Sequence, residues 1–253
     1  PRKRRCQSGL GQRESHCCSA VGCRTMRFRR WFSVRQHAED ASRFHRLGSP
    51  SGSDSDRVEL ARSVCTWPNS YYDTSLQIAK AIGASDILEV GVAYGFHAEA
   101  FLESLPDARY TGIDPYVTSY DPGDPFAGDV AFLMESDGQE SMDRLYDAVK
   151  DRLQRFGSRA QLLRHASADA ADLVRDESQD LIFVDGDHRL EAITTDLRVW
   201  WPKLRSGGVL LGDDFDWPEV EEAVTRFSED MEILPLIIRH LKTRHSLFAL
   251  LKR

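Results

Sequence analysis

Two segments in the second half of the chain each carry an apolar run that ends in acidic residues. They are DLIFVDGDH at residues 180–188 and GGVLLGDDF at residues 207–215. If both runs are parallel strands of one sheet, the residues after them lie at its carboxyl edge, where open α/β sheets bind their ligands. The polar residues at these ends are Asp185, Asp187, His188, Asp213 and Asp214.

Several carboxylates at one sheet edge repel one another unless a cation or a proton lies between them. A hard divalent cation with oxygen ligands resolves that repulsion, and an imidazole such as His188 is suited to removing a proton near neutral pH. A purely structural alternative stays open. Asp185 and Asp187 would then cap the next helix, and Asp213 and Asp214 would be solvated.

A turn that contains two glycines follows another apolar run, in ILEVGVAYGFHAEAF at residues 87–101. Gly91 and Gly95 permit positive φ angles and the close approach of a ligand, and the helix that starts there favours a negative group at its N-terminus. Glu89 would repel a pyrophosphate but can accept hydrogen bonds from an ammonium group. The motif therefore favours a nucleoside that carries an amino acid over a dinucleotide, whose Gly-x-Gly-x-x-Gly spacing is absent.

The next predicted strand also ends in an acid, in the segment YTGID. Asp114 lies 19 residues after Gly95, where a carboxylate can accept hydrogen bonds from both ribose hydroxyls of a nucleoside. A capping or loop aspartate is the alternative at this position.

Taken together, these features resemble the class I S-adenosylmethionine-dependent methyltransferases over roughly residues 65–253. The run from Glu89 to Gly95 is similar to the first motif of that family, with Ala93 where a middle glycine often stands. The resemblance implies S-adenosylmethionine as the cofactor, with Asp114 on the ribose and residues 167–169 near the adenine. The implied cofactor-binding residues are Glu89, Gly91, Ala93, Tyr94, Gly95, Asp114, Ser167, Ala168, Asp169 and Asp185.

The pair of segments DGDH and GGVLLGDD resembles a bacterial subgroup of small-molecule methyltransferases that includes macrocin-type sugar O-methyltransferases. It is also similar to the metal-dependent catechol and caffeoyl-CoA O-methyltransferases. Carried over by position, Asp185, Asp213 and Asp214 are the expected Mg2+ ligands. His188 stands where the catechol enzymes carry a lysine base, so His188, together with Asp187, is the expected catalytic pair.

These motifs must be positioned by alternating helices and strands, a pattern that is typical of a doubly wound parallel sheet. The predicted helices cover 71–82, 95–105, 141–156, 190–204 and 218–227. The predicted strands cover 87–90, 110–113, 161–163, 181–184 and 209–211, followed by a hairpin of 234–239 and 246–251. The expected fold class is α/β, with a seven-stranded, mostly parallel sheet that ends in an antiparallel hairpin.

One long segment, residues 115–140, is predicted to be a loop of the kind that forms lids or binding sites. Its apolar residues would form a wall over the substrate, namely Tyr116, Tyr120, Phe126, Phe132 and Met134. Trp200 and Trp201, on the helix after DGDH, are expected to pack in the core instead.

Charge divides the chain into a basic start and an acidic remainder. The first 50 residues hold 12 Lys and Arg against 3 Asp and Glu, whereas the whole chain has a net charge of −7. We therefore expect a disordered basic tail and linker over 1–56, with an amphipathic helix at 27–47, followed by the methyltransferase domain over 57–253. The acidic domain argues against a nucleic-acid partner, and no apolar run is long enough for a membrane helix.

The preferred function is metal-assisted transfer of a methyl group from S-adenosylmethionine to a hydroxyl of a small molecule. The alternatives are a metal-free class I methyltransferase acting on nitrogen or another acceptor, a nicotinamide oxidoreductase, and a non-catalytic nucleoside-binding domain. No cysteine follows Cys65, which fits a cytoplasmic location. The Arg-rich start leaves organelle targeting open, and assembly into a homo-oligomer is also left open.

Overall fold

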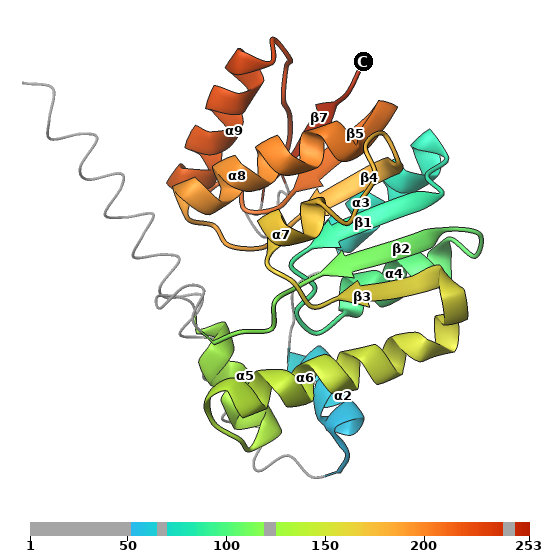
Figure 1. Ribbon diagram of the computed structural model, residues 1–253, viewed down its shortest axis with the longest axis vertical. Coiled ribbons are helices and arrows are strands. Elements are labelled where there is room, and N and C mark those ends of the chain that lie inside the picture. Colours follow the sequence, from blue (N-terminus) through green and yellow to red (C-terminus); the bar gives the residue numbers. More distant parts are fainter. Residues whose placement is uncertain (1–51, 65–69, 119–124, 240–245) are drawn as a thin grey trace, which may run out of the picture. The chain divides into compact units, whose positions relative to one another are not determined.

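The computed structural model describes residues 52–64, 70–118, 125–239 and 246–253 (Figure 1). The predicted helix at 27–47, the rest of the basic tail and Tyr120 lie outside these ranges. Within them, no helix has both the length and the apolar character needed to cross a membrane.

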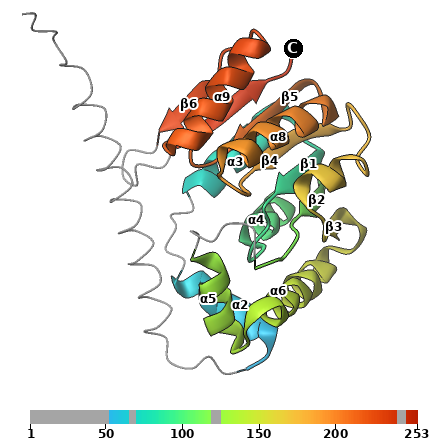
Figure 2. The ribbon, with the colours of Figure 1, turned by 60° about the vertical axis from the view of Figure 1, so that its left-hand side comes forward.

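The described strands form one seven-stranded sheet in the order β3-β2-β1-β4-β5-β7-β6 (Figure 1; β6 is labelled in Figure 2). Strands β1 to β5 pair in parallel, and β7 pairs antiparallel with both β5 and β6. The predicted sheet and its terminal hairpin are confirmed, with β7 inserted between β5 and β6. The strands are β1 Asp86–Val90, β2 Arg109–Ile113, β3 Ala160–Leu163, β4 Gln179–Val184, β5 Leu204–Gly212, β6 Leu236–Arg239 and β7 Ser246–Leu251.

The predicted helices are also present, with ends that differ by a few residues. The helices predicted over 141–156 and 190–204 end at Leu153 and Trp200, and each continues as a 3-10 turn. The helices are α2 Asp54–Val64, α3 Ser70–Ile82, α4 Phe96–Ser104, α5 Phe126–Met134, α6 Gly138–Leu153, α7 Ser167–Ala171, α8 Leu190–Trp200 and α9 Pro218–Asp230, with 3-10 turns at Gln154–Arg159 and Trp201–Lys203.

The central strands are almost wholly apolar because helices cover both faces of the sheet. Along β4, Leu181 and Phe183 face one core cluster, whereas Ile182 and Val184 face the other, as the alternation of side chains along a strand requires. The first cluster joins the sheet to α2 through α6, and the second joins it to α7 through α9. Figure 2 shows α8 and α9 side by side over the second face. The two tryptophans after DGDH are buried in this second cluster, as predicted.

Helix α2 begins at Asp54, two residues before the predicted end of the tail and linker at residue 56. Ser53 and Asp56 explain the early start because they form a reciprocal capping box. The Asp56 carboxylate accepts the Ser53 N–H at 2.9 Å, and the Asp56 N–H donates to the Ser53 hydroxyl at 3.2 Å. Asp54 also pairs with Arg144 of α6.

Helix α5 corrects the prediction that residues 115–140 are a loop. Its Leu133 and Met134 are fully buried, and Arg57 of α2 donates a hydrogen bond to the Leu133 carbonyl at 2.9 Å. Tyr116 is likewise only 1% exposed. Tyr116 and Met134 therefore belong to the core and do not form a wall over a substrate.

Candidate active site

The turn between β1 and α4 is held by backbone contacts on both sides. Gly91 donates its N–H to the carbonyl of Ile113 at 2.9 Å, and its φ of +87° lies in the left-handed region. A Cβ atom at this position would lie 1.9 Å from the carbonyl oxygen of Asp185. Gly91 therefore lets β1 end directly against the loop after β4, where the acidic residues lie.

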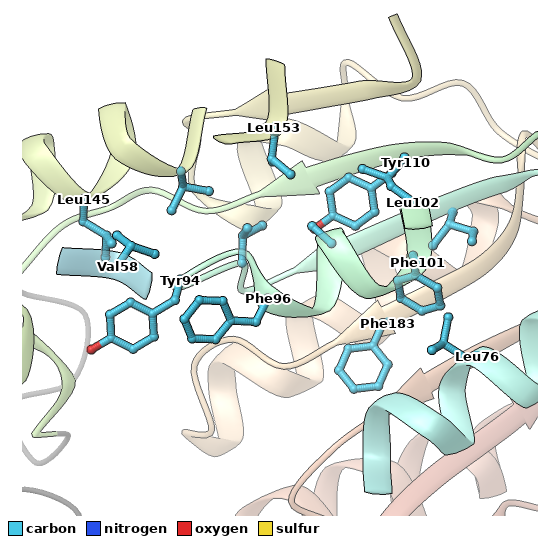
Figure 3. Packing of buried hydrophobic residues seen from close by; sticks show 14 of the residues in the cluster. Val58, Leu76, Tyr94, Phe96, Phe101, Leu102, Tyr110, Leu145, Leu153 and Phe183 are labelled. Carbon is cyan, nitrogen blue, oxygen red and sulfur yellow. The ribbon is translucent and has the colours of Figure 1, made fainter. Parts of the chain in front are cut away.

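Positive φ angles continue along the turn to the start of α4. Gly95 is the N-cap of α4 with a φ of +73°, and Ala93 has a φ of +47°. That conformation costs a non-glycine residue about 1–2 kcal/mol. The Tyr94 ring is buried and stacks on Phe96 with 5.6 Å between centroids (Figure 3). It also meets the edge of the Phe126 ring at 5.3 Å. Any contact of Tyr94 with a cofactor at the turn would therefore use its backbone.

Asp114 lies beside this turn, at the end of β2. Its Oδ2 accepts the backbone N–H groups of Val92 at 3.0 Å and Ala93 at 2.9 Å, and its Oδ1 accepts that of Tyr116 at 2.8 Å. Burial raises the pKa of Asp114, against the opposing effect of these backbone donors. The structure thus places the predicted ribose-binding acid at the turn, and the ribose contact itself stays a prediction.

Glu89 lies below the turn and is only 2% exposed. Its Oε1 lies 2.8 Å from Nδ1 of His97, and its Oε2 accepts a hydrogen bond from the Tyr110 hydroxyl. The predicted contact between Glu89 and a cofactor ammonium group therefore competes with two internal partners. The sequence reasoning missed His97, although a polar side chain within the first motif was the available signal.

The residues predicted to lie near adenine begin helix α7. Ala168 and Asp169 are exposed, whereas Ser167 donates a hydrogen bond to Asp196 and accepts one from Nε1 of Trp200 at 2.8 Å. Burial raises the pKa of Asp196 to about 7, against the hydrogen bond from Ser167. The sequence analysis also did not single out Asp196. Its position four residues before Trp200, on the buried face of α8, could have indicated a buried acid.

At the carboxyl ends of β4 and β5, three of the predicted residues come together. Nε2 of His188 lies 3.1 Å from Oδ2 of Asp214 and 3.6 Å from Oδ1 of Asp185. One ligand atom from each residue lies within 4.8 Å of the others, which is a geometry that could hold a metal ion. This acidic cluster is next to Trp217, whose ring lies 5.1 Å from that of His188.

The acidic cluster differs from the predicted metal-ligand set in one residue, because His188 is present and Asp213 is not. The N–H of Asp213 still pairs with the Val184 carbonyl at 3.3 Å, and its side chain is buried. Asp214 then adopts a left-handed φ of +55°. Of the two consecutive aspartates, Asp214 offers an oxygen within 4.8 Å of the ligand atoms of Asp185 and His188.

Asp187 lies outside the acidic cluster. Its carboxylate accepts the backbone N–H of Arg189 at 2.9 Å and pairs with the guanidinium of the same residue. This is a local turn ahead of α8, which has no side-chain cap hydrogen bond, and a catalytic role for Asp187 stays a prediction without a contact to support it.

The two carboxylates of the acidic cluster control the protonation of His188. Burial alone would lower the pKa of this imidazole, but the charges and hydrogen bonds of Asp214 and Asp185 raise the pKa of His188 well above its usual value. The protonated ring is therefore the favoured form at neutral pH in the structure as it stands. A proton on His188 balances part of the negative charge that the sequence predicted here.

The doubly wound sheet thus combines a glycine turn after β1, an acid after β2 and an antiparallel β7 between β5 and β6. Residues 88–215, about half of the chain, match the family described as a methyltransferase domain, and the chain belongs to this family. The matched region runs from β1 to the residues just after β5, so it includes both the turn and the acidic cluster. This membership argues against the alternative of a nicotinamide oxidoreductase.

Several solved structures share the fold. A Podospora anserina methyltransferase bound to S-adenosylhomocysteine is 15% identical with a TM-score of 0.52, covering 96% of this chain and 100% of that chain. An O-methyltransferase from Bacillus cereus in complex with S-adenosylhomocysteine is 15% identical with a TM-score of 0.50, covering 87% and 97%. A Staphylococcus aureus protein described as a caffeoyl-CoA O-methyltransferase is 14% identical with a TM-score of 0.54, covering 76% and 91%. At these identities the likeness shows the fold alone.

A curated relative is an uncharacterized protein of Sinorhizobium fredii, 29% identical over 137 residues. The match covers 54% of this chain but only 14% of that protein. The chain thus spans a small part of the length of the relative that it matches.

Proposed function

We propose that this chain transfers a methyl group from S-adenosylmethionine to a hydroxyl oxygen of a small molecule. The observation that carries the proposal is the contact between Gly91 and Asp185, which brings the glycine turn and the acidic cluster together at one edge of the sheet. Two fold relatives bound to S-adenosylhomocysteine support the choice of cofactor.

The cofactor would lie over the turn from Gly91 to Gly95. Its carboxylate would be placed near the N-terminus of α4, where backbone N–H groups favour negative charge. Asp114 would bind the ribose hydroxyls, and the start of α7 at Ser167 would lie near the adenine. The sulfonium activates the methyl group, so the protein has to align the acceptor and remove a proton.

His188 would take that proton in its neutral form, which is the minor form at neutral pH, so turnover should rise with pH as the ring loses its proton. The acceptor oxygen forms a bond to the methyl carbon as the bond from that carbon to sulfur breaks, and the hydroxyl proton moves to Nε2 of His188. Asp185 and Asp214 stabilise the resulting imidazolium, because both carboxylates lie within 3.6 Å of Nε2. The neutral thioether product then leaves with no net charge at sulfur.

The donor set of the acidic cluster fits a divalent cation. Asp185 and Asp214 offer the hard oxygen ligands that Mg2+ prefers, and the imidazole of His188 suits metals such as Zn2+ or Fe2+ better. A bound cation would lower the pKa of an acceptor hydroxyl and fix its position. A metal-free enzyme is the second candidate, because the His188 ring already lies where a cation would balance the two carboxylates.

Calorimetry with S-adenosylhomocysteine tests the cofactor, and NAD is the control ligand. We expect binding of the first and none of the second, and the opposite result would contradict the proposal. A screen of hydroxylated and amine-bearing acceptors, run with labelled S-adenosylmethionine with and without Mg2+, tests the acceptor class. Label recovered only on nitrogen would contradict hydroxyl transfer.

A further inference from the structure

A chain of hydrogen bonds leads from helix α3 to Glu89, beneath the glycine turn. Oγ of Ser75 lies 2.6 Å from Nε2 of His97, and Nδ1 of the same ring lies 2.8 Å from Oε1 of Glu89. All three side chains are buried. Buried polar groups have to find partners inside the protein, so the donors and acceptors along this chain can be assigned one by one.

Ser75 fixes the direction of the first bond. Its hydroxyl has one hydrogen, which it donates to the backbone carbonyl of Tyr72 at 2.9 Å. With the Ser75 hydrogen used in this bond, Nε2 of His97 carries a hydrogen and donates it to Ser75. On the other side of the ring, a single proton lies between Nδ1 and Glu89. The pair is either an imidazolium with a carboxylate or a neutral imidazole with a carboxylic acid, and its net charge is zero in both cases.

Aromatic rings hold His97 in this orientation. Tyr72 stacks on it with 4.6 Å between centroids and an angle of 7°, and Phe101 and Phe183 lie 4.3 Å and 4.6 Å away. Figure 3 shows these two phenylalanines and Tyr110 in the same part of the core. In such an apolar environment a carboxylate without a neutralising partner would be strongly unfavourable.

We infer that Ser75, His97 and Tyr110 are positioning residues that hold Glu89 as one half of a net-neutral pair. Glu89 then supports the glycine turn from below and is not the free anion that receives the ammonium group of the cofactor. The inference rests on the proposed function, because it concerns how the same cofactor is held.

Glu89→Gln separates the two roles of this residue. The amide can donate to Nδ1 of a neutral His97 and accept from Tyr110, so the hydrogen-bond chain survives without a charge. We expect the affinity for S-adenosylhomocysteine, measured by calorimetry, to fall by less than about fivefold. A direct contact between Glu89 and the ammonium group predicts a loss of about 10- to 150-fold, the scale of a hydrogen bond to a charged group. A loss greater than fivefold overturns the inference.

The proton order has a test that needs no cofactor. Ser141 of α6 is a matched control for Ser75, because it is also buried and donates to a carbonyl three residues earlier, that of Gly138 at 2.8 Å. Ser75→Ala and Ser141→Ala both lose this bond, but only Ser75→Ala also removes the hydroxyl that lies 2.6 Å from Nε2 of His97. We expect the melting temperature of Ser75→Ala to fall by about 2–10 °C more than that of Ser141→Ala. Equal losses overturn the proton order.

The two experiments also distinguish this inference from the proposed function. If the wild-type chain does not bind S-adenosylhomocysteine, the proposed cofactor is wrong, and the comparison of Ser75→Ala with Ser141→Ala still decides the order of protons. If the wild-type chain binds it and Glu89→Gln loses more than fivefold, the cofactor stands and the neutral pair is wrong.

Discussion

The backbone of Gly91 packs directly on the backbone of Asp185. A Cβ atom on Gly91 would lie 1.9 Å from the carbonyl oxygen of Asp185 and 2.5 Å from its carbonyl carbon. The glycine turn and the acidic cluster thus share a contact that no side-chain rotation can relieve. A displacement of the Gly91 backbone must therefore also displace the backbone of Asp185, because closely packed backbone atoms have no free space to move into.

Gly91→Ala should therefore destabilise the fold beyond its effect on cofactor binding. Gly207→Ala is the control, since Gly207 has a similar φ of +81° but open space around its Cβ position. The control should lose about 1–2 kcal/mol from the left-handed backbone alone. Gly91→Ala should lose clearly more or fail to fold, as measured by thermal denaturation. Equal losses in the two variants would show that the contact can relax.

Ala93→Gly should stabilise the protein, because glycine removes the strain of a φ of +47°. The gain should be about 0.5–1 kcal/mol once the greater freedom of glycine in the unfolded chain is subtracted. Ala100→Gly within α4 should instead lose about 0.5–1 kcal/mol, the usual cost of glycine in a helix. Denaturant unfolding of both variants measures the difference. A loss in both would show that Ala93 is not strained.

Asp114→Ala should weaken the binding of S-adenosylhomocysteine by about 1.5–3 kcal/mol, if the carboxylate binds the ribose hydroxyls. Asp114 also accepts three backbone N–H groups, so Asp114→Asn is needed to keep part of that local structure. Calorimetry should show an intermediate affinity for the asparagine variant. Unchanged affinity in both variants would leave Asp114 as a purely structural residue of the turn.

His188→Ala should lower turnover by roughly 10²–10⁴-fold, the range for loss of a general base, with little effect on cofactor affinity. Asp214→Ala should have a similar effect, and chelation should mimic it if a cation acts. Asp187→Ala tests the other member of the expected catalytic pair: it should retain most activity if Asp187 only pairs with Arg189, and a loss as large as that of His188→Ala would support the pair. Steady-state kinetics with and without excess chelator measure these effects. Full activity in the chelator would remove the metal from the mechanism.

Asp196 predicts a pH dependence of stability. Its folded pKa of about 7 lies above the usual 3.8 of an aspartate because of burial. Between these values the unfolded chain has lost a proton that the folded chain keeps, so the free energy of unfolding falls as pH rises from about 4 to 7. Asp196→Asn should therefore stabilise the protein at pH 8, by up to a few kcal/mol, but not at pH 4. A similar gain at both pH values, seen by thermal denaturation, would contradict this.

Much of the fold could be predicted from the sequence because apolar runs and their periodicity identify buried strands and helices. The exceptions have tertiary causes. Helix α5 is short and depends on burial of residues such as Leu133, and α2 starts early because of a capping box that the low-complexity composition concealed. Neither feature is visible as a long periodic pattern.

The acidic cluster was predicted to within one residue. Asp185 and Asp214 were placed by their strands, but the choice between two consecutive aspartates depends on the left-handed φ of Asp214. The partners of Glu89 could not be predicted either. Ser75 of α3 and His97 of α4 reach Glu89 of β1 only in the folded structure. The spacing of these residues in the sequence does not indicate the contacts.

The insertion of β7 between β5 and β6 has a consequence for synthesis on the ribosome. The outer edge of β5 stays unpaired at least until synthesis reaches Ser246, the first residue of β7, about 34 residues after β5 ends at Gly212. At about 5–20 residues per second, that interval lasts about 2–7 s. During this time the nascent chain presents an apolar strand edge to its neighbours, and such edges promote pairing between chains. Slower growth and lower expression temperature should therefore affect the yield of soluble protein more than the stability of the finished domain would indicate.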